Sequence, residues 1–273
     1  MELTAQQYLS KGSSSPYVAR TMIQTGELLA PFGLEDPMRD AVMQVSHDLM
    51  IRLVACQNRA EHVTTGVDDG KRQLLEHGVD IQGNGLIVTL PCVLDLQANV
   101  EDFLHSAKQA LRETGRLFEP FYDKRFDHRF QRIRSWAKRQ FGPDDQLVVL
   151  LEDDAKWIER VISLRNAVEH PGSGDGTLII KDFRLGSAGS PPVVIEPTWN
   201  KEGEIPVPIA ADMIAIMDNI LTLFEDLLCD CLLRLPSPLP LVRYEIPEDQ
   251  RNPSAPMRLR ILPRDPVFPQ HDA

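Results

Sequence analysis

The feature that most constrains the fold of this chain is a long stretch of helical periodicity from residue 209 to residue 235. Apolar side chains recur there at spacings of three and four residues, while acidic side chains occupy the other positions. A helix of about 27 residues spans ~40 Å, which is enough to cover a core and leave surface for a second protomer. Its apolar face comprises Ile209, Met213, Ile216, Ile220, Leu223, Phe224, Leu227, Cys231 and Leu235.

Three further segments carry the same periodicity, at about 36–60, 95–115 and 144–170. Asp36 followed by proline is a typical helix start, and Asp95 is placed to cap the second segment. Between these two segments, turn-forming residues predict an irregular region with one short strand at 85–90. The predicted fold class is therefore mainly α: a bundle of four to five long helices, with a small β-hairpin at about 177–196 before the last helix.

The segments outside these helices set the expected domain boundaries. We expect an N-terminal extension over residues 1–35, a helical domain over 36–235 and a proline-rich tail over 236–273. Within the tail, only residues 257–262 alternate like a strand.

Composition limits the class of protein. The formal net charge of −11 argues against broad, non-specific binding of nucleic acid. The four cysteines lack C-x-x-C spacing, which argues against a zinc ribbon or a disulfide scaffold and is typical of a reducing cytosol. The chain start resembles no signal peptide, and acidic residues interrupt the longest apolar segments. We expect a cytoplasmic protein with no membrane span, metal site or cofactor.

The end of the third helical segment carries the most informative polar residues. Helical geometry places Arg165 and Glu169 on the face that otherwise holds core residues such as Ile158. Asn166 and His170 are four residues apart and lie together to one side, and a proline then ends the helix. A charge on a core face requires a partner or a ligand, because an unpaired buried charge costs several kcal/mol.

Two interpretations of this helix end remain open. In the first, Arg165 and Glu169 form a salt bridge and His170 is a cation near the last helix carbonyls. In the second, Arg165 and His170 converge on a phosphate. The position of Arg165 on the core face of the helix favours the second interpretation, because a surface salt bridge belongs on the opposite face.

Basic charge is concentrated in one segment of this acidic chain, residues 123–142. Its seven basic residues face two acidic ones, and an apolar stripe recurs at helical spacing. The segment is either a solvated face over packed aromatic residues or a ridge that binds phosphates near Arg165 and His170. The residues expected to contact RNA in the second case are Arg125, Arg129, Arg132, Lys138 and Arg139.

The four helical segments, with an arginine and a histidine at the end of the third, resemble a HEPN domain (higher eukaryotes and prokaryotes nucleotide-binding). That family is an all-α bundle with an R-x(4–6)-H motif, in which the residue after Arg is usually Asn, Asp or His. Arg165-Asn166-Ala167-Val168-Glu169-His170 fits the form with four intervening residues. The resemblance covers about residues 36–235, and the hairpin and the proline-rich tail depart from it.

The resemblance implies a metal-independent endoribonuclease that acts as a homodimer, in a toxin–antitoxin or defence setting with a cognate antitoxin or other partner protein. The 2′-hydroxyl of RNA would attack the adjacent phosphate. His170 would serve as acid or base and Arg165 would stabilise the phosphorane. Asn166 would orient His170 or the phosphate, and Glu169 would hold Arg165 in place. Because one motif histidine per chain cannot easily be both acid and base, a composite site across a dimer makes chemical sense.

The alternative is a non-catalytic HEPN-like module that dimerises or binds a protein or nucleotide partner. The Arg165–Glu169 pair would then be structural, and the last helix would provide the interaction surface. The negative net charge favours this alternative, whereas the basic segment favours the enzyme. The two differ in geometry, because an enzyme needs Arg165 and His170 to open to one cleft.

Overall fold

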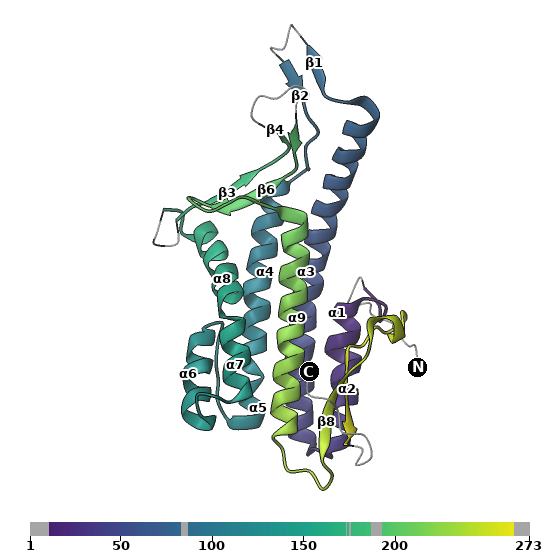
Figure 1. Ribbon diagram of the computed structural model, residues 1–273, viewed down its shortest axis with the longest axis vertical. Coiled ribbons are helices and arrows are strands. Elements are labelled where there is room, and N and C mark those ends of the chain that lie inside the picture. The colour runs from purple at the N-terminus through teal and green to yellow at the C-terminus, as the bar shows by residue number, and fades with distance from the viewer. Residues whose placement is uncertain (1–10, 83–86, 173, 175, 187–192, 265–273) are drawn as a thin grey trace, which may run out of the picture. The chain divides into compact units, whose positions relative to one another are not determined.

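Three long helices dominate the computed structural model: α3 (Asp36–His77), α4 (Leu96–Arg116) and α9 (Ile209–Leu233) (Figure 1). The structure describes residues 11–82, 87–172, 174, 176–186 and 193–264. The protein is mainly helical with a few small antiparallel sheets, as the sequence predicts. None of the helices within the described ranges is both long and apolar enough to cross a membrane.

The chain divides into two compact units, and each of the three long helices contributes residues to both. Unit 1 comprises residues 1–54, 110–155 and 220–273, and unit 2 comprises residues 55–109 and 156–219. The described parts of the expected extension and of the expected tail both belong to unit 1.

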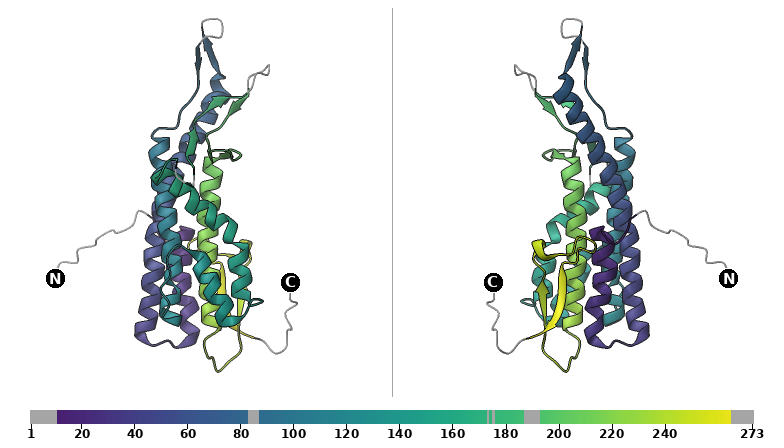
Figure 2. Two further views of the ribbon diagram at one scale, coloured as in Figure 1. Left: turned by 90° about the vertical axis from the view of Figure 1, so that its left-hand side faces the viewer. Right: turned by 90° about the vertical axis from the view of Figure 1, so that its right-hand side faces the viewer.

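Unit 1 adds short elements to its parts of the long helices. The N-terminal elements are α1 (Pro16–Val18), a π-helical turn (Ala19–Ile23), α2 (Gln24–Leu29) and a 3-10 turn (Ala30–Phe32). The central helices are α5 (Phe118–Tyr122), α6 (Phe130–Phe141) and α7 (Gln146–Asp153). A 3-10 turn (Glu248–Gln250) lies between the antiparallel strands β8 (Leu241–Glu245) and β9 (Leu259–Pro263). This strand pair lies along the C-terminal part of α9 (Figure 2).

A buried charged cluster attaches β9 to the helices of unit 1. The Glu225 side chain is fully buried, and its carboxylate accepts hydrogen bonds from Arg20 Nε (2.7 Å) and Arg258 Nη1 (2.9 Å). Gln24 donates to the same carboxylate (2.7 Å), and its own carbonyl accepts the backbone N–H groups of Arg258 (2.6 Å) and Leu259 (2.7 Å). These buried hydrogen bonds hold the β9 part of the proline-rich tail within unit 1.

Aromatic packing fills another part of unit 1. The rings of Phe118 and Trp136 meet edge to face with centroids 5.5 Å apart, and Tyr122 and Phe141 join the same cluster. Asp145 caps α7 by accepting the N–H of Leu147 (3.0 Å), as expected for an N-cap residue. The sequence predicts an apolar stripe along residues 126–141, and its members Phe130, Ile133 and Ala137 are buried on one face of α6.

The third predicted helix is two helices in the structure, α7 and α8 (Ala155–Glu169), with the break at Asp154. Three consecutive acidic residues, Glu152, Asp153 and Asp154, lie where α7 ends. Negative charge is unfavourable at the carbonyl end of a helix, and aspartate is a poor residue for a helix interior. The prediction of one continuous helix over 144–170 was therefore wrong. Apolar residues keep the same helical spacing on both sides of Asp154, so the spacing gave no sign of the break.

Unit 2 holds most of the small strands. Antiparallel β1 (Asp80–Gln82) and β2 (Ile87–Thr89) form one pair. A longer hairpin pairs β3 (Leu178–Lys181) with β6 (Thr198–Lys201) and β4 (Arg184–Leu185) with β5 (Val194–Ile195) (Figure 1). The expected hairpin before the last helix is therefore present, but it extends to residue 201. Strand β7 (Val207–Pro208) then pairs with β6 and leads into α9.

Trp199 of β6 joins the strands of unit 2 to its helical core. Its side chain is fully buried, its ring centroid lies 6.2 Å from that of Phe103, and its Nε1–H donates to Asp212 (2.6 Å). Arg160 of α8 also donates to the Asp212 carboxylate (3.0 Å). The buried indole therefore has both an apolar environment and a partner for its N–H group.

Helix α3 continues to His77, so the prediction of an irregular region directly after residue 60 was wrong. Gly66 and Gly70, the second of which the sequence suggests as a turn residue, lie inside this helix. A Cβ atom on Gly70 would lie 2.6 Å from the Phe183 ring, and one on Gly66 would lie 2.9 Å from Val93. These glycines therefore permit close packing on the helix and do not end it.

Candidate functional site

Arg165 lies on α8 with only 12% of its side chain exposed. It forms an ion pair with Glu169 one turn later, and its Nη2 lies 3.3 Å from His105 Nδ1 on α4. Burial lowers the pKa of the Arg165 guanidinium, because desolvation disfavours its charged form. The buried phase that the sequence predicts for Arg165 is thus matched by a charged partner and an adjacent imidazole.

Asn166 and Glu169 connect α8 to a second residue of α4, Lys108. Lys108 Nζ donates to Asn166 Oδ1 (2.8 Å) and lies 4.0 Å from Glu169 Oε2. The Lys108 side chain is 17% exposed, so its ammonium group is partly withdrawn from water. We define the α4–α8 cluster as His105, Lys108, Arg165, Asn166 and Glu169.

The sequence interpretation did not include the two α4 residues of this cluster. His105 and Lys108 are three positions apart and therefore neighbours on one side of α4, beside apolar residues that predict its core face. A polar pair at helical spacing is a weak signal, because solvated helix faces are full of such pairs. Only the packing of α4 against α8 within unit 2 shows that they meet Arg165 and Asn166.

His170 lies one residue beyond the end of α8. Its backbone N–H donates to the Asn166 carbonyl (2.8 Å), which completes the last helical turn. The imidazole is exposed, and no side-chain hydrogen bond or ion pair joins it to any residue that the structure describes. Arg165 and His170 therefore share a helix end, but no contact joins their side chains, and Arg165 meets His105 instead.

The α4–α8 cluster brings two cations and an imidazole together near the end of α8. Lys108 lies 4.0 Å from the Glu169 carboxylate that pairs with Arg165, and the His105 imidazole lies 3.3 Å from Arg165. The exposed imidazole of His170 follows at the helix end. Cations and imidazoles are groups that can contact an anion and carry a proton.

The residues predicted to bind RNA lie in unit 1 and separate into three groups. Lys138 pairs with Glu152 of α7 (2.5 Å), which lowers the pKa of that carboxyl. Arg139 is exposed. The other three line a cavity of 290 Å³, which we call the arginine cavity, together with residues that the sequence interpretation did not include. Its lining is Arg112, Arg116, Arg125, Phe126, Asp127, Arg129 and Arg132.

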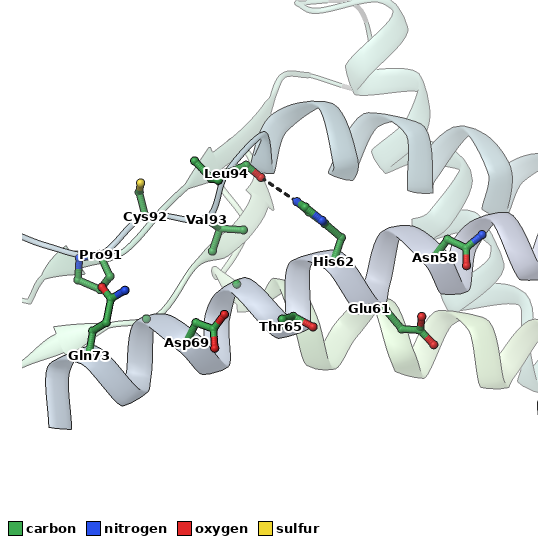
Figure 3. A pocket seen from close by; sticks show the side chains of 12 residues that line it. Asn58, Glu61, His62, Thr65, Asp69, Gln73, Pro91, Cys92, Val93 and Leu94 are labelled. Atoms are coloured by element: carbon green, nitrogen blue, oxygen red, sulfur yellow. Dashed lines mark hydrogen bonds between the residues drawn. The ribbon is translucent and has the colours of Figure 1, made fainter. Parts of the chain in front are cut away.

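A second cavity, of 520 Å³, lies in unit 2 beside α3 (Figure 3). It is lined by one side of α3 from Asn58 to Gln73 and by residues 91–94, and His62 Nε2 donates to the Leu94 carbonyl across it (3.3 Å). Figure 3 shows the Glu61, Asp69 and Cys92 side chains spread along this cavity. In the part of the chain that the structure describes, no group of three or more His, Cys, Asp or Glu residues is placed to hold a metal ion.

Comparison of the chain with protein-family models, with curated proteins and with solved structures found no match.

Proposed function

We propose that this chain is a metal-independent endoribonuclease of the HEPN type, in which Arg165 and His170 act on a phosphodiester. The observation that carries the proposal is the meeting of Arg165, His105 and Lys108 in the α4–α8 cluster, at the helix end that carries the exposed imidazole of His170. A structural salt bridge requires only Arg165 and Glu169. The additional Lys108 and His105 make the group suited to an anion.

The reaction follows from the chemistry of RNA. His170 accepts the proton of the 2′-hydroxyl, and the 2′-oxygen attacks the adjacent phosphorus. Arg165 stabilises the negative charge of the pentacoordinate phosphorane, with Lys108 as a second cation. The bond from phosphorus to the 5′-oxygen then breaks, and an acid protonates that oxygen. The products are a 2′,3′-cyclic phosphate end and a 5′-hydroxyl end.

The scheme still needs a residue that acts as the acid and protonates the leaving 5′-oxygen. In a homodimer, His170 of the partner subunit supplies it, which is the composite arrangement that the motif implies. The exposure of His170 suits this arrangement because a second copy can reach it. His105 offers a second imidazole in the same chain, 3.3 Å from Arg165. The two arrangements differ in whether one chain suffices for cleavage.

The first experiment incubates purified protein with mixed RNA in the presence of EDTA. Wild type is compared with Arg165→Ala, His170→Ala and the matched control His77→Ala, which removes another exposed histidine of unit 2. We expect wild type and His77→Ala to leave 2′,3′-cyclic phosphate ends. The two site variants should be slower by about 10²-fold or more, because each removes a group that acts in the transition state.

A mixing experiment then locates the acid. Arg165→Ala and His170→Ala chains are unfolded together, refolded together and assayed. Recovery of part of the activity supports a composite dimeric site, and no recovery supports a site within one chain. Normal cleavage by His170→Ala would contradict the mechanism.

The second candidate function is a non-catalytic binding module. It is favoured by the internal contacts of the cluster, since Glu169 engages Arg165 and Asn166 engages Lys108. A folded wild-type protein that cleaves no RNA in the first experiment would support this candidate over the enzyme.

A further inference from the structure

The arginine cavity of unit 1 gathers guanidinium groups from separate elements. Arg112 and Arg116 come from α4, Arg125 and Arg129 from the connection before α6, and Arg132 from the first turn of α6. Five arginines and one aspartate thus face one space of 290 Å³. Guanidinium groups that face one small cavity repel one another unless an anion lies between them. The arrangement of these five arginines therefore calls for a counter-charge.

Three arginines of the cavity are paired and two are not. Arg116 donates to Asp48 (2.9 Å) and to Glu113 (2.5 Å), and Arg129 donates to Asp127 through Nε (2.9 Å). Arg125 Nε lies 3.9 Å from Glu119 Oε2. Arg112 and Arg132 are exposed, and neither side chain forms a hydrogen bond or ion pair with any residue that the structure describes. The chain has 40 acidic residues against 29 basic ones, so a counter-charge is not scarce. These two guanidinium groups are therefore available to an external anion.

Close packing fixes the wall of the cavity that precedes α6. A Cβ atom on Gly115 of α4 would lie 2.7 Å from the Asp127 backbone oxygen, so only glycine lets this connection approach the helix so closely. The Asp127 carboxylate accepts the Arg129 backbone N–H (2.9 Å) as well as its side chain, which orients Arg129. The arginines before α6 are thus held over those of α4 by the backbone. The backbone of this wall is therefore ordered before a ligand binds, which lowers the entropy cost of binding.

One aromatic residue, Phe126, also lines the cavity. Its ring packs against Phe118 and Trp136, with centroids 5.7 and 5.6 Å away, so the aromatic cluster holds it in place. A fixed aromatic ring beside cationic groups is the combination that binds a base and its phosphate together. Arginine suits the phosphate because its planar guanidinium donates two parallel hydrogen bonds to phosphate oxygens.

We propose that the arginine cavity binds the phosphate of a nucleotide, with Arg112 and Arg132 as the principal phosphate ligands and Phe126 as the contact for the base. The ligand is either a free nucleotide or one unit of an RNA strand, since both offer the same chemistry. The proposal does not depend on RNA cleavage by Arg165 and His170, which belong to unit 2.

Calorimetric titration of the full chain tests the site with three probes: inorganic phosphate, AMP and an eight-nucleotide 2′-O-methyl RNA. The methylated RNA lacks the attacking hydroxyl, so the cleavage mechanism proposed above cannot act on it. We expect Arg112→Gln and Arg132→Gln each to raise the Kd for AMP or RNA about tenfold. They should also reduce the salt dependence of RNA binding. Phe126→Leu should weaken AMP more than inorganic phosphate.

The matched control is Arg260→Gln, which removes the charge of an exposed arginine on β9 of the same unit. It should bind every probe as wild type does. AMP and RNA binding with equal affinity identifies a single nucleotide as the ligand, and much tighter RNA binding identifies a strand. The proposal would be overturned if Arg112→Gln and Arg132→Gln bound every probe as tightly as wild type. It would also be overturned if Arg260→Gln lost as much affinity as these two variants. Circular dichroism of each variant separates loss of binding from loss of folding.

Discussion

Two arginine clusters of unit 1 follow opposite rules. Around Glu225, Arg20 and Arg258 are buried, and both donate to the same carboxylate. In the arginine cavity, Arg112 and Arg132 are exposed, and neither pairs with a residue in the described ranges. A buried charge must have a partner within the protein, whereas an exposed one is stabilised by water. Arginine pairing therefore separates a structural role from availability to a ligand.

The α4–α8 cluster of unit 2 lies between these two extremes. Arg165 is mostly buried and pairs with Glu169, as a structural arginine does. Lys108 adds a second cation 4.0 Å from the same carboxylate, and His170 adds an exposed imidazole. Arg165 therefore has a structural partner, as Arg20 and Arg258 do, and also lies in a group with a second cation and an imidazole.

The largest expected effect is on the buried cluster. Glu225→Ala leaves the buried Arg20 guanidinium without its carboxylate and removes one of the three carboxylates that Arg258 contacts, so the free energy of unfolding should fall by about 3–5 kcal/mol. Arg112→Gln and Arg132→Gln should change it by no more than about 0.5 kcal/mol, because they alter exposed side chains without partners in the described chain. Urea unfolding monitored by circular dichroism measures both. A loss below 1 kcal/mol for Glu225→Ala would break the distinction between the clusters.

A smaller effect is expected where backbone packing holds the cavity wall. Gly115→Ala places a methyl group against the Asp127 carbonyl, and such overpacking should lower the free energy of unfolding by about 1–3 kcal/mol. Gly26→Ala is the matched control, since it lies in α2 with open space around it and should gain about 0.5–1 kcal/mol from helix propensity. Urea unfolding of the two variants gives the comparison. Equal stability of the two would show that the approach of Asp127 to α4 is not tight.

The smallest expected effect is that of pH on the arginine cavity. The Arg129 guanidinium lowers the pKa of Asp127 to about 2, so this carboxyl is ionised throughout the neutral range. Because its folded pKa is depressed, its stabilising contribution is complete above the ordinary aspartate pKa and is lost only as the pH falls toward 2. The Kd for 2′-O-methyl RNA should therefore change less than about twofold between pH 5.5 and 8, since neither arginine nor a phosphodiester titrates there.

Calorimetric titrations across this pH range test that expectation. A large fall in RNA affinity as the pH rises from 6 to 8 would show that a histidine takes part in binding, either His128 beside Asp127 or one outside the arginine cavity.

Much of the helical content follows from local rules. The start of α3 at Asp36 and the course of α9 from Ile209 follow from capping and from apolar spacing, which act over a few residues. The buried phase of Arg165 follows from the same spacing, and the structure places that side chain against α4. The glycines of α3 were misinterpreted because a glycine that ends a helix and one that packs against Phe183 look the same in sequence.

What the sequence by itself determined is therefore the location of the long helical segments, the concentration of basic charge at residues 123–142 and the face of its helix on which Arg165 lies. Tertiary structure alone decided which distant residues complete each cluster. Lys108 meets Asn166, Arg112 joins the arginines before α6, and Glu225 joins Arg258. The physical reason is that helical periodicity specifies which face of an element is buried, whereas a polar partner depends on which element packs against that face.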